Sequence, residues 1–335
     1  MRMSGKNMPT MQDQAISPQA VSNARKDVKG RIALRMLSRL GDSLWWPLLL
    51  SAAVLTTAFG IEMGHPQWAF NLTYFSLAIA LFVLERQRPH LHEWLKSDHQ
   101  EWADLGHTAL TKSAVQLLVI SLGFLGITSS VGGPAGTGWW PNHWPMFAQV
   151  GLGLLIAEFG LYWGHRLAHE WSWLWRFHAV HHSARKLWFF NTGRFHFIDT
   201  LKSLLLSGVL LALAGAPNTV VIWIGSITAY IGFLTHCNIR MHNPWISYVF
   251  NTPRLHRWHH SMDLKEGNKN YGENLMLWDV VFGTFFDDQS RQPPREIGIR
   301  DAMPRGFAGQ MLAPFRWHHY QQNYRQGKVP AGECL

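Results

Sequence analysis

The sequence predicts an all-α membrane protein, a bundle of about four to six membrane helices that carries a histidine-rich helical cap on the cytoplasmic side. Two observations lead to this prediction. The apolar residues, 47% of the chain, are gathered in long runs, and the polar residues fill the gaps between them. In addition, 19 histidines occur in 335 residues, and several of them form tight clusters.

Six apolar runs are candidates for membrane segments. The first 40 residues are polar and basic, without the apolar centre of a cleavable signal peptide, and their basic side chains stand directly before the first run. Because Lys and Arg collect on the cytoplasmic side of membrane proteins, we expect the chain to enter the membrane from the cytoplasm. The runs cover approximately residues 44–61, 68–84, 109–129, 146–164, 201–214 and 220–234.

The last two runs are short for full crossings, and the sequence Gly-Ala-Pro-Asn at 215–218 separates them. They form either two spans or a hairpin that enters the membrane only partly. In both cases the chain returns to the side that it left. Counting the crossings from a cytoplasmic start therefore predicts that the histidine clusters and His236 lie on the cytoplasmic side.

The net charge of +9 and the two cysteines exclude several classes of protein. The basic residues stand beside apolar runs, which indicates membrane orientation, and no nucleic-acid-binding motif is visible, so we expect no nucleic-acid partner. Cys237 and Cys334 are far apart and form no CxxC pair. This pattern is not that of a disulfide framework or of a cysteine-bound iron–sulfur cluster.

Three histidine clusters follow the fourth and sixth runs. Residues at positions i, i+3 and i+4 of a helix share one face, so each cluster is expected to present its imidazoles together. Imidazole binds iron, zinc, copper and nickel, and a four-coordinate zinc takes at most four protein ligands. Eight imidazoles therefore fit two metal ions better than one. The clusters are His165 and His169; His178, His181 and His182; and His256, His259 and His260.

Glu158 is a further candidate, because it lies inside an apolar run seven residues before His165. An acidic residue in such a place has a function or a buried partner. It either orients a ligand histidine from outside the metal shell or forms a hydrogen bond to a neighbouring helix. The sequence leaves both roles open.

The pattern HxxxH, HxxHH and HxxHH between membrane segments resembles the fatty acid hydroxylase / sterol desaturase superfamily of membrane di-iron oxygenases. The resemblance covers about residues 100–287. Five shorter stretches also match: Arg194-Phe195-His196; Phe233 to Asn238; Pro253 with His256; Asn270-Tyr271-Gly272; and Leu277-Trp278-Asp279 with Phe282-Gly283-Thr284. One departure is His196-Phe197, where many relatives have His-Pro.

The resemblance implies two iron ions, a lipid substrate that enters from the bilayer, and an external electron donor of the ferredoxin or cytochrome b5 type. It implies nine ligands: His165, His169, His178, His181, His182, His236, His256, His259 and His260. Further candidates, as ligands or as their supports, are His196, His242, Asn238 and Glu158.

We expect four segments on this basis. Residues 1–40 form a polar, basic tail, and 41–100 form a first membrane helix pair with an interfacial segment. Residues 101–287 form the di-iron domain, and 288–335 form a C-terminal surface tail.

Two other functions are weighed against the oxygenase. A zinc-dependent membrane hydrolase normally adds a carboxylate or an HExxH general base, and no HExxH occurs here. A metal transporter is expected to place its ligands near the bilayer midplane, whereas these histidines stand at the ends of the runs. Within the leading interpretation, the substrate remains open among sterols, fatty acyl chains, alkylglycerols and carotenoids. Hydroxylation and desaturation begin with the same hydrogen abstraction, so the motif does not separate them.

Overall fold

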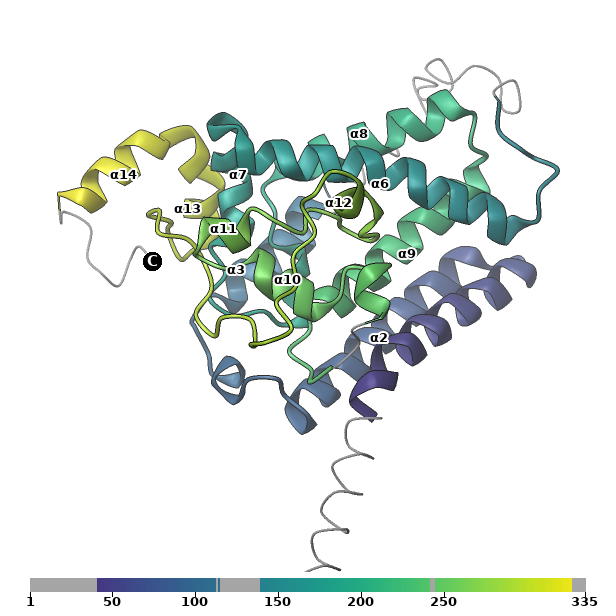
Figure 1. Cartoon of the computed structure of the whole chain (residues 1–335), viewed down its shortest axis with the longest axis horizontal. Helices are drawn as coiled ribbons and strands as arrows, with labels where there is room; N and C mark the ends of the chain where they lie inside the picture. Colours follow the sequence, from purple (N-terminus) through teal and green to yellow (C-terminus); the bar gives the residue numbers. More distant parts are fainter. Residues whose placement is uncertain (1–40, 113, 115–138, 242–244, 327–335) are drawn as a thin grey trace, which may run out of the picture.

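The chain is described by a computed structural model that covers residues 41–112, 114, 139–241 and 245–326. The described residues form helices, turns and isolated β-bridges but no β-strand. The predicted all-α class is therefore confirmed (Figure 1).

Five helices among the described residues are long and apolar enough to cross a membrane, within the predicted range. They correspond to five of the six apolar runs. The third run, 109–129, lies outside the described residues apart from 109–112 and 114. The five helices are Gly41–Glu62, α2 (Pro66–Gln87), α6 (Met146–Glu170), α8 (Phe197–Ala214) and α9 (Asn218–His236).

The connection between α8 and α9 shows why these two helices form a pair. Gly215 ends α8 in the left-handed conformation, with φ of 77°, which glycine adopts without steric cost. Pro217 then stands in extended conformation directly before α9 and cannot continue the preceding helix. The chain therefore reverses over a few residues, and α9 carries it back to His236.

Close backbone contact joins α6 to α8. A Cβ atom at Gly160 would lie 2.6 Å from the carbonyl oxygen of Leu206, a distance that real Cβ atoms do not adopt. Only glycine permits this approach. α9 is the most buried of the five helices and contacts both α6 and α2. Its apolar side chains, including Tyr230 and Phe233, belong to the main hydrophobic core.

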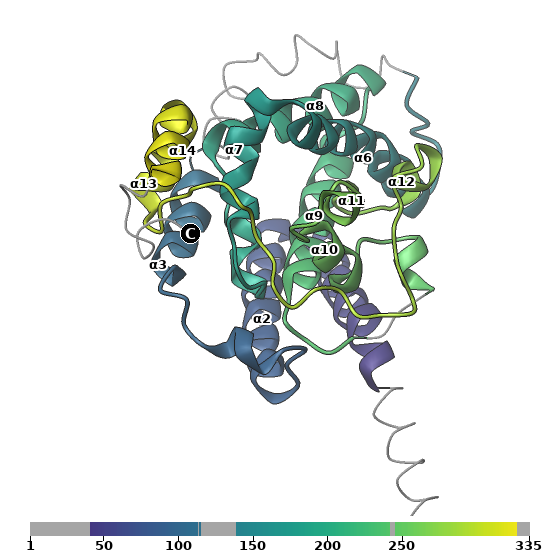
Figure 2. The same ribbon diagram turned by 60° about the vertical axis from the view of Figure 1, so that its left-hand side comes forward.

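Short helices form a cap at one end of the bundle (Figure 2). The membrane helices α2, α6 and α9 end at this cap, and α8 begins there. The α-helices of the cap are α3 (Glu101–Gly106), α7 (Ser172–His182), α10 (Pro253–His259), α11 (Leu264–Gly267), α12 (Leu277–Val281), α13 (Phe307–Leu312) and α14 (Trp317–Arg325). The 3-10 and π segments are η1 (His92–Leu95), η2 (His107–Lys112), η3 (Phe189–Gly193), η4 (Ile246–Tyr248) and η5 (Ala313–Arg316).

The C-terminal segment differs from the expected surface tail in its described part, 288–326. It crosses the cap and buries Ile297, Met303 and Gln310. Gln310 is held by hydrogen bonds to Gln100 and His107. The reason is that this segment covers polar groups of the cap, so some of its side chains face inward although its overall composition is polar.

Candidate metal centre

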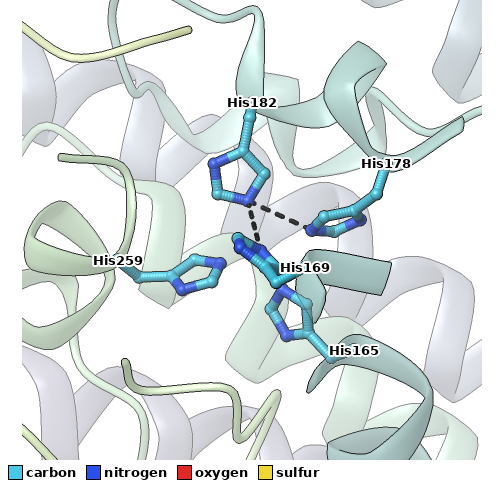
Figure 3. Close-up of side chains that lie close together, drawn as sticks. All are labelled: His165, His169, His178, His182 and His259. Atoms are coloured by element: carbon cyan, nitrogen blue, oxygen red, sulfur yellow. Dashed lines mark hydrogen bonds between the residues drawn. The ribbon is translucent and has the colours of Figure 1, made fainter. Parts of the chain in front are cut away.

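Two groups of histidines meet inside the cap. In each group, ligand nitrogens from the different imidazoles lie within 4.8 Å of one another. The first histidine group has five members and the second has four, and together they contain all nine histidines of the predicted ligand set. The first group is His165, His169, His178, His182 and His259 (Figure 3), and the second is His181, His236, His256 and His260.

Four helices supply these side chains. The last turns of α6 carry His165 and His169, and His236 is the last residue of α9. The other six histidines stand on α7 and at the end of α10. Because the membrane helices α6 and α9 both end at the cap, the histidines of their last turns lie there.

Each HxxHH cluster is divided between the two groups. On α7, His178 and His182 join the first group, whereas His181 joins the second. On α10 the division is reversed, since His256 and His260 join the second group and His259 the first. In each cluster the two histidines that are four residues apart therefore belong to one group, and the histidine between them belongs to the other group. Because both clusters contribute to both groups, the two groups lie side by side.

The imidazole rings approach one another through their Nε2 atoms. In the first group, Nε2 of His182 lies 3.1 Å from Nε2 of both His169 and His178. In the second group, Nε2 of His256 lies 2.8 Å from that of His236 and 3.0 Å from that of His260.

These separations fit a metal ion. A metal–nitrogen bond of about 2.1 Å places neighbouring ligands at right angles about 3 Å apart. Nε2 of His165 and of His259 is also buried and has no hydrogen-bond partner among the described residues. Such buried, unpaired nitrogens are costly unless they bind an ion. The donor sets therefore fit one metal in each group.

Polar partners behind the rings orient the first group. A hydrogen bond at Nδ1 fixes the ring and leaves Nε2 as the ligand atom. The partners are the carbonyl of Tyr271 for His165 (2.7 Å), Asn268 Oδ1 for His169 (3.1 Å), Asp199 Oδ2 for His178 (2.8 Å) and the carbonyl of Lys269 for His259 (2.8 Å).

The second group has a different support. Nδ1 of His181 donates to the carbonyl of Arg194 at 3.2 Å, and Nδ1 of His236 donates to Oδ1 of Asn191 at 2.9 Å. Both acceptors belong to the segment that contains η3. This segment therefore orients two of the four ligands of the second group.

Burial favours the neutral form of the clustered imidazoles on α7 and at the end of α10. It lowers the pKa of His178, His181, His182, His256 and His260 well below the ordinary value, and neighbouring histidines lower it further. Burial lowers the pKa of His259 to about 4. Neutral imidazole is the form that binds metals, so these side chains can bind an ion without first losing a proton.

Three of the four further candidates are described by the structure, and none of these three belongs to either group. His196 caps α8, accepting a hydrogen bond at Nδ1 from the amide of Ile198. Asn238 exchanges two hydrogen bonds with the backbone of Leu91. His242 lies outside the described residues.

The partners of Glu158 lie in a loop rather than on a neighbouring helix. Glu158 is fully buried and accepts hydrogen bonds from the amides of Glu273 (2.6 Å) and Asn274 (3.0 Å). It holds the loop whose Tyr271 carbonyl orients His165. Glu158 therefore acts on the first group through the backbone.

Asp199, Asn191 and Asn268 were not predicted as supports of the histidines. Their partners His178, His236 and His169 lie 21, 45 and 99 residues away in the sequence. Asp199 gave the clearest signal, as an acidic residue just before an apolar run. It also forms an ion pair with Lys202 at 2.5 Å.

A cavity of about 640 Å³ opens onto the first group beside His169, His182 and His259. Its rim includes positively and negatively charged side chains, among them Lys265 and Asp301. His169 is half-buried, whereas the other eight histidines are buried. The first group is therefore the one that comes closest to the surface of the cap.

The sequence of this chain is similar to those of known lipid hydroxylases and monooxygenases. Residues 150–284 match the fatty acid hydroxylase family. Ornithine lipid hydroxylase OlsE of Rhizobium tropici is 48% identical over 82% of this chain and 84% of that protein. Alkylglycerol monooxygenase of Homo sapiens is 30% identical over 44% of this chain and 32% of that protein. Methylsterol monooxygenase 2-2 of Arabidopsis thaliana is 27% identical over 43% and 54%, respectively. No solved structure matches the chain.

Proposed function

Because this chain belongs to the fatty acid hydroxylase family, we propose that it is a multi-pass membrane enzyme that hydroxylates a lipid with dioxygen. The observation that carries the proposal is the pair of all-histidine groups at the end of a membrane bundle. The relatives support hydroxylation, since their names are those of lipid hydroxylases and monooxygenases.

The proposed cofactor is a pair of iron ions, one in each histidine group. When bound, they would supply the activation of dioxygen that an unactivated C–H bond requires and that no side chain provides. The chain's own part is to hold nine neutral imidazoles in place, to orient them through their Nδ1 partners and to exclude water around the second group. Among the described residues neither group includes a carboxylate, which weakens the zinc-hydrolase alternative.

The reaction that we propose is balanced as a monooxygenation. One oxygen atom enters the C–H bond as a hydroxyl group, and the other leaves as water. An external donor supplies two electrons, and the solvent supplies two protons. Desaturation would consume the same reactants but would leave a double bond and two molecules of water.

Ornithine lipid is the substrate that we propose first, from the name of the relative that is 48% identical over most of both chains. A membrane lipid can reach the cap directly from the bilayer, because α6 and α9 carry the chain from the membrane to the histidines. Holding one carbon of the lipid close to the site would determine which C–H bond reacts.

The electron donor is proposed to be a small acidic protein of the ferredoxin or cytochrome b5 type. We place its docking site at the rim of the cavity, because His169 there is the least buried of the nine histidines. Lys265 and Arg300 stand on this rim and would attract an acidic partner.

The histidine end is proposed to face the cytoplasm. The connections at the other end of the bundle, 62–66, 139–145 and 215–217, contain no Lys or Arg, whereas Arg86 and Arg88 stand where α2 reaches the cap. This distribution follows the positive-inside rule. We also retain the division into segments 1–40, 41–100, 101–287 and 288–335 as a proposal, and the family match at 150–284 falls within the third segment.

The proposal is tested with the full chain purified in detergent. Iron content is measured for the unchanged protein and for His181→Ala, and ornithine lipid is then supplied with a chemical reductant and isotopically heavy dioxygen. We expect two irons per chain, loss of one in the variant, and a product that contains one heavy oxygen atom. An iron-loaded protein that gives a desaturated product would correct the reaction type. A protein that stays iron-free after reconstitution with iron would overturn the di-iron proposal.

A further inference from the structure

The second histidine group depends on a segment that is itself held from the N-terminal part of the chain. This segment, residues 188–194, contains η3 and provides Asn191 Oδ1 to His236 and the carbonyl of Arg194 to His181. We propose that Glu85 and Asp104 are positioning residues that fix this segment and thereby assemble the second group. The inference rests on the proposed function, since it concerns the second metal ion.

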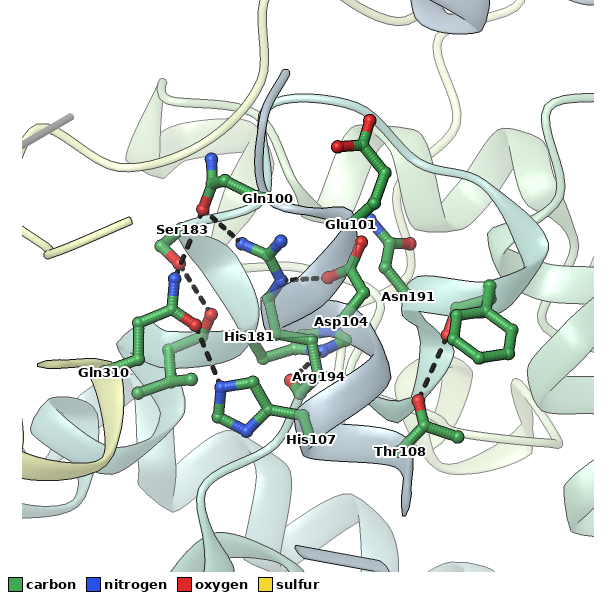
Figure 4. A network of polar contacts seen from close by, with 12 residues as sticks. Gln100, Glu101, Asp104, His107, Thr108, His181, Ser183, Asn191, Arg194 and Gln310 are labelled. Atoms are coloured by element: carbon green, nitrogen blue, oxygen red, sulfur yellow. Dashed lines mark hydrogen bonds and ion pairs between the residues drawn. The ribbon is translucent and has the colours of Figure 1, made fainter. Parts of the chain in front are cut away.

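Asp104 of α3 holds both ends of the segment. Its Oδ1 accepts from Nε of Arg194 at 2.5 Å, and its Oδ2 accepts from Nε1 of Trp188 at 2.9 Å. Both Asp104 and Arg194 are almost completely buried, and Nη1 of Arg194 also donates to Oε1 of Gln100 at 2.8 Å (Figure 4). A buried, hydrogen-bonded ion pair permits little displacement, because separating the charges would leave each of them unpaired. The carbonyl of Arg194 is therefore held at His181.

Glu85 fixes the near end of the segment and the chain after His236. Its Oε1 accepts from the amide of Phe189 at 2.8 Å and from the amide of Asn238 at 2.9 Å. Phe189 begins η3, and Asn238 stands two residues after His236. One carboxylate oxygen thus joins the support of His236 to the backbone that carries His236. Glu85 stands at the end of α2 and is 2% exposed.

The first group is supported by a different part of the chain. Its partners Asp199, Asn268, Lys269 and Tyr271 all fall within residues 150–284, which match the family. Glu85 and Asp104 precede that range. The N-terminal part of the chain therefore does more than anchor the protein, because it positions the segment that supports the second histidine group.

Glu158 is the matched control. Like Glu85, it is a buried glutamate of a membrane helix whose carboxylate accepts from two backbone amides, but it holds the loop beside the first group. A variant at either position removes the same chemical group from a similar environment. Only the histidine group that is affected should differ.

The experiment measures ferrous iron bound to the full chain in detergent. Glu85→Ala and Glu158→Ala remove all of these acceptor oxygens. Each is combined with His259→Ala, which leaves the second group intact, and with His256→Ala, which leaves the first group intact. We expect Glu85→Ala to weaken binding of the remaining iron by about 10- to 100-fold in the His259→Ala background only. Glu158→Ala is expected to do so in the His256→Ala background only. Asp104→Asn should behave as Glu85→Ala does.

Trp188→Phe provides a milder test if a charge variant does not fold, since it removes only the indole hydrogen bond to Asp104. It should weaken iron binding at the second group by less than Glu85→Ala does. Equal losses in both backgrounds would indicate a general effect on folding and would overturn the inference, as would unchanged iron binding. Absence of iron from the unchanged protein would instead overturn the proposed function and this inference with it.

Discussion

Nδ1 of His178 donates a hydrogen bond of 2.8 Å to Oδ2 of Asp199, and both side chains are buried beside the first histidine group. The carboxylate fixes the ring of His178 and increases the basicity of its Nε2. Oδ1 of the same carboxylate pairs with Lys202 one turn along α8. The start of a membrane helix thus determines the orientation of a candidate ligand on α7.

Replacing Asp199 by Asn should weaken metal binding at the first group. The amide lacks the negative charge that strengthens His178 as a ligand, and we expect iron affinity to fall by about 10- to 100-fold. Titration of the metal-free protein with ferrous iron measures the change. An unchanged affinity at both groups would show that Asp199 serves the helix rather than the site.

Two neighbouring histidines of one cluster should control different metal ions. His178→Ala is expected to remove the iron of the first group, and His181→Ala that of the second, because α7 directs these side chains to different groups. The double variant should lose both ions, so that the effects add. Iron content per chain measures this. If either single variant lost both irons, the two groups would form one interdependent site.

His196→Ala should leave the iron content unchanged. The imidazole of His196 caps α8 through the amide of Ile198 and accounts for none of the contacts in either group. Loss of a helix cap costs about 0.5–2 kcal/mol of stability. Thermal unfolding in detergent should therefore shift to a lower temperature while iron remains bound. A loss of iron at normal stability would instead indicate that His196 is a ligand.

Gly160→Ala should destabilise the bundle because the new Cβ would lie 2.6 Å from the Leu206 carbonyl. Overpacking of this kind costs about 1–3 kcal/mol. At Gly151 of the same helix an added Cβ would meet no neighbouring atom within 4 Å, so this position serves as the control. Gly151→Ala is expected to be neutral or to stabilise the helix by up to about 1 kcal/mol. Thermal unfolding of both variants decides; equal shifts would argue against the close α6–α8 contact.

Lys265→Glu should slow electron delivery from an acidic donor at low ionic strength. Lys265 stands on the rim of the cavity, and reversal of its charge would repel such a partner. The rate should recover at high salt, because surface charges are then screened. Donor-dependent turnover is compared across salt concentrations, with Arg325→Glu on α14 as the control. A defect that persists at high salt would assign Lys265 another role.

The local pattern of the sequence was sufficient for the fold class and for the set of clustered histidines. Apolar runs predicted the five described membrane helices because span length depends on composition along one stretch of chain. The spacing of His178, His181 and His182 predicted that their imidazoles stand together on one helix, because helical periodicity is also local. His236 stands outside the three clusters and entered the ligand set only through the family resemblance.

The tertiary structure decided how the histidines are divided and what holds them. Helical spacing placed each HxxHH cluster on one face, but only the packing of α6, α7, α9 and α10 separates the histidines four apart from the one between them. The groups that orient the histidines also lie far from them in the sequence; Tyr271, for example, is 106 residues from His165. Backbone carbonyls and single carboxylates carry no motif of their own. Their roles arise from contacts between distant segments, which no local periodicity records.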